Sequence, residues 1–243
     1  MYRLLILVGF AATSCAPTYI SNSRNVPMFA EGGEFAGSVA LSSGVDVQTA
    51  YSFTDHVAAM GNLNVLTQSS TTEAGESFTR KNIFGEAGIG YFTRTKQMRT
   101  EVFAGYGMGN RTSYEALYFF RKPNAEALIA DGKYSRIFVQ PSISTNKRKF
   151  NIAFTARFSM VNFTEFKTKD PGAASPTFKP TDGIQLFIEP AITTRFHLVG
   201  NVRGFFQLSL NRPVPDDVYY TYVPLQAAVG IQIHTGQLRT RVY

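Results

Sequence analysis

The stretch NIFGEAGIGYFTRTKQMRTEVFAGYGMGN, Asn82–Asn110, decides the fold of this chain. It contains two runs in which apolar residues alternate with polar or small ones, and three turn residues, 95–97, separate the runs. Because successive side chains of a strand point to opposite faces, Ile83 and Ile89 share a face that excludes Glu86. The stretch predicts an antiparallel hairpin with one apolar face and one face that is polar, small or charged.

The same alternation recurs along the chain, in about ten segments that approach the roughly 9–11 residues of a tilted transmembrane strand. Recurrence at this length favours an all-β, antiparallel, up-and-down transmembrane β-barrel. A soluble periplasmic barrel or sandwich would show the same alternation and remains an alternative. The expected strands are 33–42, 45–54, 57–68, 81–94, 98–111, 133–145, 148–163, 184–195, 197–210 and 219–234.

Every second expected strand carries the same short pattern: an inward Gln or Glu, a small residue two places on, and an outward Ile, Val or Tyr between small neighbours. Repetition in a constant phase predicts hairpin units at equivalent heights in one barrel. Pro141 and Pro190 stand at equivalent places and predict locally missing hydrogen bonds, since proline cannot donate one. The inward residues of the pattern are Gln48, Glu86, Gln140, Glu189 and Gln226.

The connections between these segments alternate between tight and long, with one exception, a tight turn at 42–44 on the side of the long loops. Bacterial barrels have short periplasmic turns and longer extracellular loops, so both chain ends are expected in the periplasm. In one long connection, residues 123–130 predict a short helix with proline in its first turn. The tight turns are expected near 54–56, 95–97, 146–147 and 195–196, and the long loops at 69–80, 112–132, 164–183 and 211–218.

The N-terminus has the features of an export signal. Residues 1–14 have a positive start and an apolar core too short for a permanent membrane helix. The motif Ala12-Thr13-Ser14-Cys15 resembles the bacterial lipobox, although Ala12 stands where leucine is usual. The resemblance implies that Cys15, the sole cysteine, is lipidated. The absence of Asp at position 16 is consistent with sorting to the outer membrane.

Taken together, the chain resembles the small bacterial outer-membrane β-barrel lipoproteins. The resemblance implies a signal peptide at 1–14, a lipidated linker at 15–32, an outer-membrane barrel at 33–234 and a C-terminal tail at 235–243. The lipid is then expected to enter the inner leaflet, from the periplasmic side.

The inward faces predict a polar lumen filled by ion pairs, because an unpaired buried charge costs several kcal/mol. With about ten strands, the barrel is expected to be closed rather than a wide channel. The residues expected to form this lumen network are Glu86, Glu101, Arg136, Arg157, Glu189 and Arg203.

Catalytic signals are weak. The three histidines have no Ser, Asp or Glu at triad spacing, metal-ligand clusters are missing, and the glycines lie in strands rather than before a helix. The sequence therefore predicts no catalytic, cofactor-binding or metal site. Although the net charge is +7, the basic residues are scattered, which argues against nucleic-acid binding.

The function expected from these features is a structural or surface-interaction role. The partners expected are outer-membrane lipids and lipopolysaccharide, with an extracellular ligand or protein at the loops of a monomer. A narrow pore or transporter for small solutes and a lipid-modifying enzyme are the alternatives.

Overall fold

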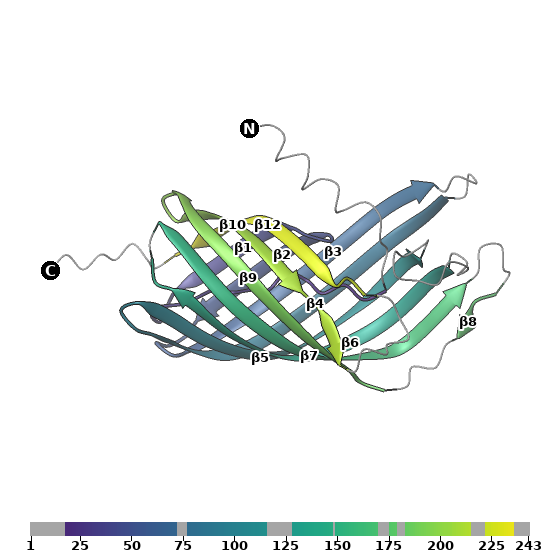
Figure 1. Ribbon diagram of the computed structural model, residues 1–243, viewed down its shortest axis with the longest axis horizontal. Helices are drawn as coiled ribbons and strands as arrows, with labels where there is room; N and C mark the ends of the chain where they lie inside the picture. Colours follow the sequence, from purple (N-terminus) through teal and green to yellow (C-terminus); the bar gives the residue numbers. More distant parts are fainter. Residues whose placement is uncertain are drawn as a thin grey trace.

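Twelve strands form one antiparallel sheet in the computed structural model, which describes residues 18–71, 77–115, 128–147, 149–169, 175–178, 183–214 and 222–235. Ten of the strands in these ranges close into a barrel, because β9 pairs with β7 as well as β10, and β1 pairs with β12 (Figure 1). The ring strands are β1 (Phe35–Leu41), β2 (Val45–Ser52), β3 (Val57–Thr71), β4 (Ser77–Arg94), β5 (Met98–Glu115), β6 (Leu128–Thr145), β7 (Phe150–Lys169), β9 (Gln185–Val199), β10 (Val202–Leu210) and β12 (Leu225–His234). Two short strands, β8 (Thr177–Phe178) and β11 (Arg212–Val214), extend the sheet beside β7 and β9.

The expected up-and-down order is confirmed, because ring strands that follow each other in the sequence are neighbours in the ring. Most outward side chains in the central part of these strands are apolar and exposed, and the inward ones are buried. Such a closed barrel leaves no strand edge unpaired in lipid. The outward apolar residues include Val39, Leu41, Val47, Leu63, Ile83, Ile89, Val102, Met108, Ile137, Ile152, Phe158, Ile192, Leu208, Val229 and Ile233.

The barrel is taller on one side than on the other. Strands β4 to β7 contain 18 to 20 residues, whereas β1, β2, β10 and β12 contain 7 to 10. About 9–11 residues cross a bilayer, so the long strands continue beyond it on the side of the long connections. This extension occupies the right of Figure 1. The expected strands 81–94 and 133–145 begin later than β4 and β6, because alternation becomes less regular in these outer extensions.

Three local expectations differ from the structure. The turn between β9 and β10 lies at Gly200, with φ of 55°, rather than at 195–196. Glycine adopts this left-handed conformation without a steric penalty, and Arg195 remains in the strand. The last strand begins at Leu225 rather than 219. Residues 128–130 of the expected helix open β6, and residues 123–127 lie outside the described ranges.

Proline has the effect expected of it in β6. The register between β6 and β7 is the same before and after Pro141, but the pairing is interrupted between Val139 and Ser142. The missing donor therefore breaks the ladder locally without a bulge.

Glycines face the lumen where aromatic rings lie against the wall. A Cβ added to Gly105 would lie 2.2 Å from the Ala87 carbonyl oxygen and 2.6 Å from the Phe138 ring. A Cβ at Gly85, which lies on the outward face with Ile83, would by contrast have its nearest neighbour at 4.0 Å. The close approach of Phe138 therefore requires glycine at position 105.

We expect Gly105→Ala to lower the free energy of unfolding by about 1–3 kcal/mol, because overpacking forces the rigid backbone and the ring apart. Gly85→Ala is the matched control and should change it little. Urea unfolding in detergent, followed by the gel mobility of unheated samples, measures both. Equal midpoints for the two variants would contradict the expectation.

Candidate functional site

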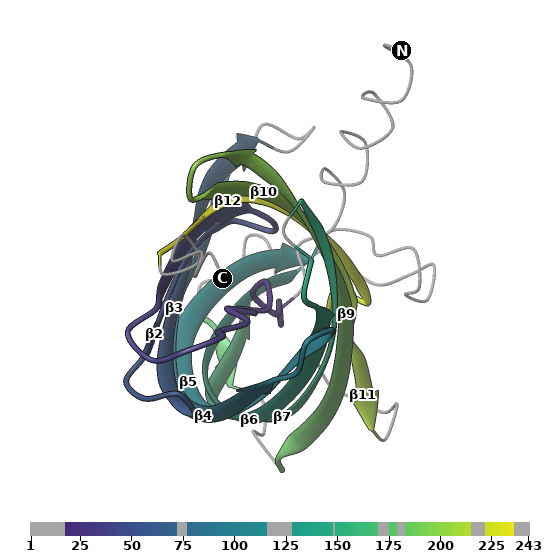
Figure 2. The same cartoon turned by 90° about the vertical axis from the view of Figure 1, so that its left-hand side faces the viewer.

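The barrel lumen is filled by the protein's own N-terminal segment. Residues 18–30, called the lumen segment below, are all buried. Figure 2, which looks into the barrel, shows this segment in purple inside the ring. We expected these residues to link the lipidated cysteine to the first strand; they reach that strand by crossing the lumen.

The two ends of the lumen segment lie at opposite ends of the barrel. Tyr19 forms a parallel bridge with Tyr222, and its carbonyl oxygen accepts a hydrogen bond of 3.3 Å from the Val223 amide, just before β12. Gly32, two residues after the segment, donates to Asp55 Oδ1 at 2.8 Å in the tight turn between β2 and β3. The segment therefore runs from the long-loop end to the tight-turn end.

Five charged side chains meet at the centre of the lumen. From the wall, Arg157 Nε lies 2.6 Å from Glu189 Oε2 and its Nη1 lies 3.4 Å from Glu86 Oε1, while Arg136 also pairs with Glu86. From the lumen segment, Arg24 Nη2 lies 3.7 Å from Glu189 Oε2. All five are buried. The four wall charges balance, and Arg24 adds one positive charge.

Uncharged side chains of the lumen segment complete the hydrogen bonds of this cluster. Tyr19 donates its hydroxyl to Glu189 Oε1 at 2.9 Å. Asn22 donates to Glu86 Oε1 at 2.8 Å and accepts from Arg136 at 2.6 Å and from Arg157 at 3.1 Å. The ionised groups therefore gain partners from both the wall and the segment, as buried charges require.

The backbone of the lumen segment is bound by inward amide side chains. Gln48 donates to the Ser23 carbonyl at 2.8 Å, and Gln140 donates to the Asn25 carbonyl at 2.7 Å. Gln207 accepts from the Arg24 amide at 2.7 Å and donates to its carbonyl at 3.0 Å. An extended chain with no neighbouring strand needs such partners for its buried polar groups.

These contacts explain the repeated pattern found in the sequence. Its inward residues on β2, β4, β6 and β9 are the side chains that contact residues 19–25. The fifth, Gln226 on β12, donates to the Ser43 hydroxyl at 3.4 Å instead. Four of the five inward residues of the pattern thus bind the lumen segment.

The predicted network residues fall into two groups. The structure brings together Glu86, Arg136, Arg157 and Glu189. The other two lie apart: Glu101 accepts a hydrogen bond from the Met28 amide at 2.8 Å, and half-buried Arg203 lies opposite Gln232 on β12. These residues lie nearer the tight-turn end. There, Arg99 donates to the Met28 carbonyl at 2.6 Å, and Arg195 donates to the Val26 carbonyl.

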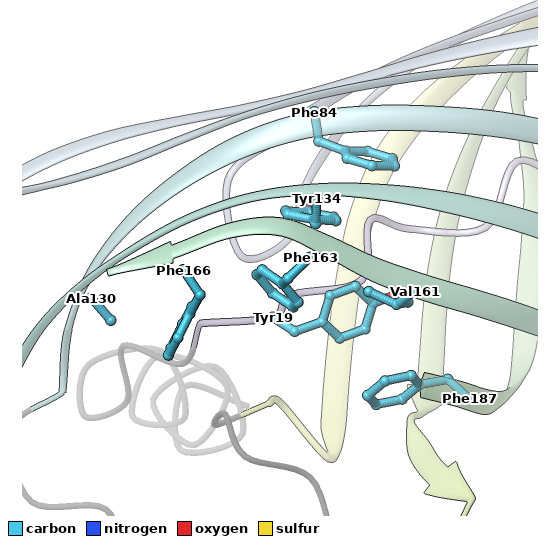
Figure 3. Packing of buried hydrophobic residues seen from close by; sticks show 8 residues of the cluster. All are labelled: Tyr19, Phe84, Ala130, Tyr134, Val161, Phe163, Phe166 and Phe187. Atoms are coloured by element: carbon cyan, nitrogen blue, oxygen red, sulfur yellow. The ribbon is translucent and has the colours of Figure 1, made fainter. Parts of the chain in front are cut away.

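An aromatic cluster surrounds the outer end of the lumen segment (Figure 3). The Tyr19 ring lies 4.7 Å from that of Phe187 and 5.8 Å from that of Tyr134, and the Tyr134 ring stacks on Phe84 at 5.3 Å. The Arg136 guanidinium lies 4.4 Å from the Phe84 ring centroid. Buried aromatic rings therefore pack around the outer end of the lumen segment.

Sequence reasoning missed Arg24, Asn22 and Tyr19, although one signal was present. A solvated linker is rich in polar residues, whereas residues 18–30 include Tyr19, Ile20, Val26, Met28 and Phe29. Five large apolar side chains in thirteen residues indicate burial. The partners of Arg24 had no such signal, because they lie far away in the sequence.

The inner end of the lumen segment is held by a carboxylate. Glu34 accepts a hydrogen bond of 2.6 Å from the Ala30 amide and lies 3.4 Å from His234 Nε2. Burial alone raises the pKa of Glu34, but hydrogen bonds from His234 and Ala30 outweigh it and leave this pKa below its ordinary value of 4.5. Glu34 is therefore held in its ionised form.

The lowered pKa of Glu34 predicts that the stability of the protein depends on pH. Because the pKa of Glu34 is lower in the folded protein, its stabilising contribution is present above pH 4.5 and is lost as pH falls through the folded value. We expect the urea midpoints of the wild type and Glu34→Gln to differ at pH 7 and to converge as pH falls below 4.5, through the lowered pKa of Glu34. A gap that stays constant over this range would contradict the assignment.

The histidines have structural contacts. His56 stacks on Tyr91 at 5.3 Å, His197 contacts the Gly200 carbonyl at 3.0 Å, and His234 pairs with Glu34. Among the described residues, no group of three or more His, Cys, Asp or Glu side chains is placed to hold a metal ion. Within the same ranges, no helix is long and apolar enough to span a bilayer.

No protein-family model and no curated protein matches the chain. Several solved structures are similar to it. KdgM porin is 9% identical, with a TM-score of 0.37 over 82% of this chain and 98% of that one. The translocator domain of autotransporter NalP from Neisseria meningitidis is 9% identical, with a TM-score of 0.39 over 82% and 86%. Neisserial surface protein A is 12% identical, with a TM-score of 0.32 over 83% and 97%. Likeness at this level says nothing about what the chain does.

Proposed function

We propose that this protein is a closed outer-membrane lipoprotein with a structural or surface-interaction role, lipidated at Cys15. The observation that supports a closed lumen is the central cluster, in which Arg24 of the lumen segment lies beside Glu189 and Arg157 of the wall. A pore for small solutes needs a continuous aqueous path, whereas here side chains of the segment fill the lumen at the level of the cluster.

The surface role belongs to the outer extension of β4 to β7, which carries exposed charged residues above the apolar belt. Lys133 is 59% exposed and Lys167 31% exposed in their side chains, and both pair with Glu165. Lys81 is also exposed on β4. Phosphate groups of lipopolysaccharide are the anionic partners that such lysines favour. The connections beyond this wall are the places for an extracellular ligand or protein.

The test of the closed lumen is the conductance of the full mature protein in a planar bilayer. We expect no steady current from the wild type. A stable, ion-selective current would refute the closed lumen and favour the pore, with Glu86 and Arg136 as part of its selectivity filter. A protein that does not insert at all would refute the membrane assignment and favour the soluble barrel.

A further inference from the structure

The direction of the lumen segment decides on which side of the membrane the preceding residues emerge. Its first residues lie beside Tyr222 and Val223, at the long-loop end, and it enters β1 from the tight-turn end. Since tight turns of bacterial barrels are periplasmic, the segment crosses the barrel from the cell-surface end to the periplasmic end. Thr18 and Tyr19, the first described residues, therefore lie at the surface end of the barrel.

The upstream end of the segment lies at the outer edge of the apolar belt. Leu225, three residues after Tyr222, is the first residue of β12 and is 55% exposed on the outside of the barrel. It pairs with Leu210, which is 53% exposed at the end of β10. Tyr19, beside Tyr222, thus lies close to the level at which the outer leaflet meets water.

Cys15 is separated from Thr18 by only two residues. An extended chain spans at most about 3.3–3.6 Å per residue, so Cys15 lies within about 11 Å of Thr18. The hydrocarbon core of a bilayer is about 30 Å thick. If Cys15 carries a lipid, this short tether would bring the acyl chains to the outer leaflet rather than to the inner one.

We propose that the chain is threaded outward through its own barrel, so that its mature N-terminus is displayed at the cell surface and the lipid on Cys15 enters the outer leaflet. This replaces the expected inner-leaflet anchor. The lipid part rests on the proposed lipidation of Cys15, whereas the direction of threading rests on the contacts of residues 18–34. The protein would then be anchored in the outer leaflet by acyl chains beside the barrel.

The experiment uses the full chain in cells, with a site-specific protease sequence inserted between Ala16 and Pro17 and with radiolabelled palmitate in the medium. Protease added to intact cells should cut this site and separate the label from the barrel. The same sequence in the β3–β4 connection is the surface control, and the sequence between Lys96 and Gln97, in a periplasmic turn, should resist cutting. A Cys15→Ser variant should incorporate no label.

The possible outcomes of this experiment separate the direction of threading from the lipidation of Cys15. Cutting on intact cells with loss of label from the barrel supports both. Cutting of a chain that never carries label overturns the lipidation of the proposed function and its outer-leaflet anchor, while the threading stands. Resistance on intact cells, with cutting only after permeabilisation, overturns the threading whatever the label shows.

A second measurement tests the direction of threading without an inserted protease site, in case the insertion prevents folding. In the otherwise unmodified full chain, Tyr19→Cys with Tyr222→Cys should form a disulfide on oxidation, because the two positions are bridge partners. Tyr19→Cys with Asp55→Cys should not, since Asp55 lies at the opposite end of the barrel. Crosslinking of the second pair and not of the first would overturn the direction of threading.

Discussion

Replacing Glu189 by alanine is expected to lower the free energy of unfolding by about 3–5 kcal/mol, because removing one partner of a buried ion pair leaves the others uncompensated. Glu189 accepts from Tyr19, Ser159 and Arg157 and lies beside Arg24. Without it, three arginines face a single carboxylate, that of Glu86. The chain has no tryptophan, so unfolding in urea is best followed by the mobility of unheated samples on gels.

The matched control is Glu165→Ala on the outer extension of β7. Glu165 also pairs with two cations, Lys133 and Lys167, but in contact with water. Solvent screens such pairs, so this variant should unfold close to the wild type. Similar losses in the two variants would mean that the central cluster contributes no more than a surface ion pair.

Replacing Asn22 and Arg24 together by alanine is expected to give discrete current steps in a bilayer, where the wild type is silent. Between them, these two side chains contact all four charged residues of the central wall, Glu86, Arg136, Arg157 and Glu189. Arg136 and Arg157 keep their pairs with Glu86 and Glu189, so the wall remains balanced and folded. The lumen segment should therefore loosen while the barrel stays intact.

Ser23→Ala is the control on the same segment. It removes a hydroxyl that accepts one hydrogen bond of 3.0 Å from Gln48, while Gln48 keeps its bond of 2.8 Å to the Ser23 carbonyl. This variant should remain silent. If the double variant folds and is equally silent, then the aromatic cluster around Tyr19 or the wall itself closes the lumen, and the segment's polar contacts do not.

The fold could be predicted from the sequence because the alternation is local. Strands such as β7 separate outward Phe154 and Phe158 from inward Arg157 without reference to the rest of the chain. That pattern predicts the ten strands, their order and which of their side chains point outward. Their outer limits do not follow, since beyond the membrane the outward face no longer has to be apolar, as at Lys133 and Lys167.

Of the candidate site, only the residues on the barrel wall could be predicted from the sequence. Glu86, Arg136, Arg157 and Glu189 are polar residues at inward positions, and balance of charge makes their pairing foreseeable. Arg24 is not on a strand, and nothing periodic relates it to Glu189. Only the three-dimensional path of the segment brings these two residues together.

The enclosed segment also constrains the order of assembly. Arg24 is made early but bonds to Gln207 and Asn211, which follow it by 183 and 187 residues. Contacts between such distant residues form slowly, because a long loop must close first. The ring is sealed by β1 and β12, which pair over Ala36–Leu41 and Val229–His234. Sealing this seam around a segment already in place would avoid threading a finished ring, so we expect closure of β12 onto β1 to come last in folding.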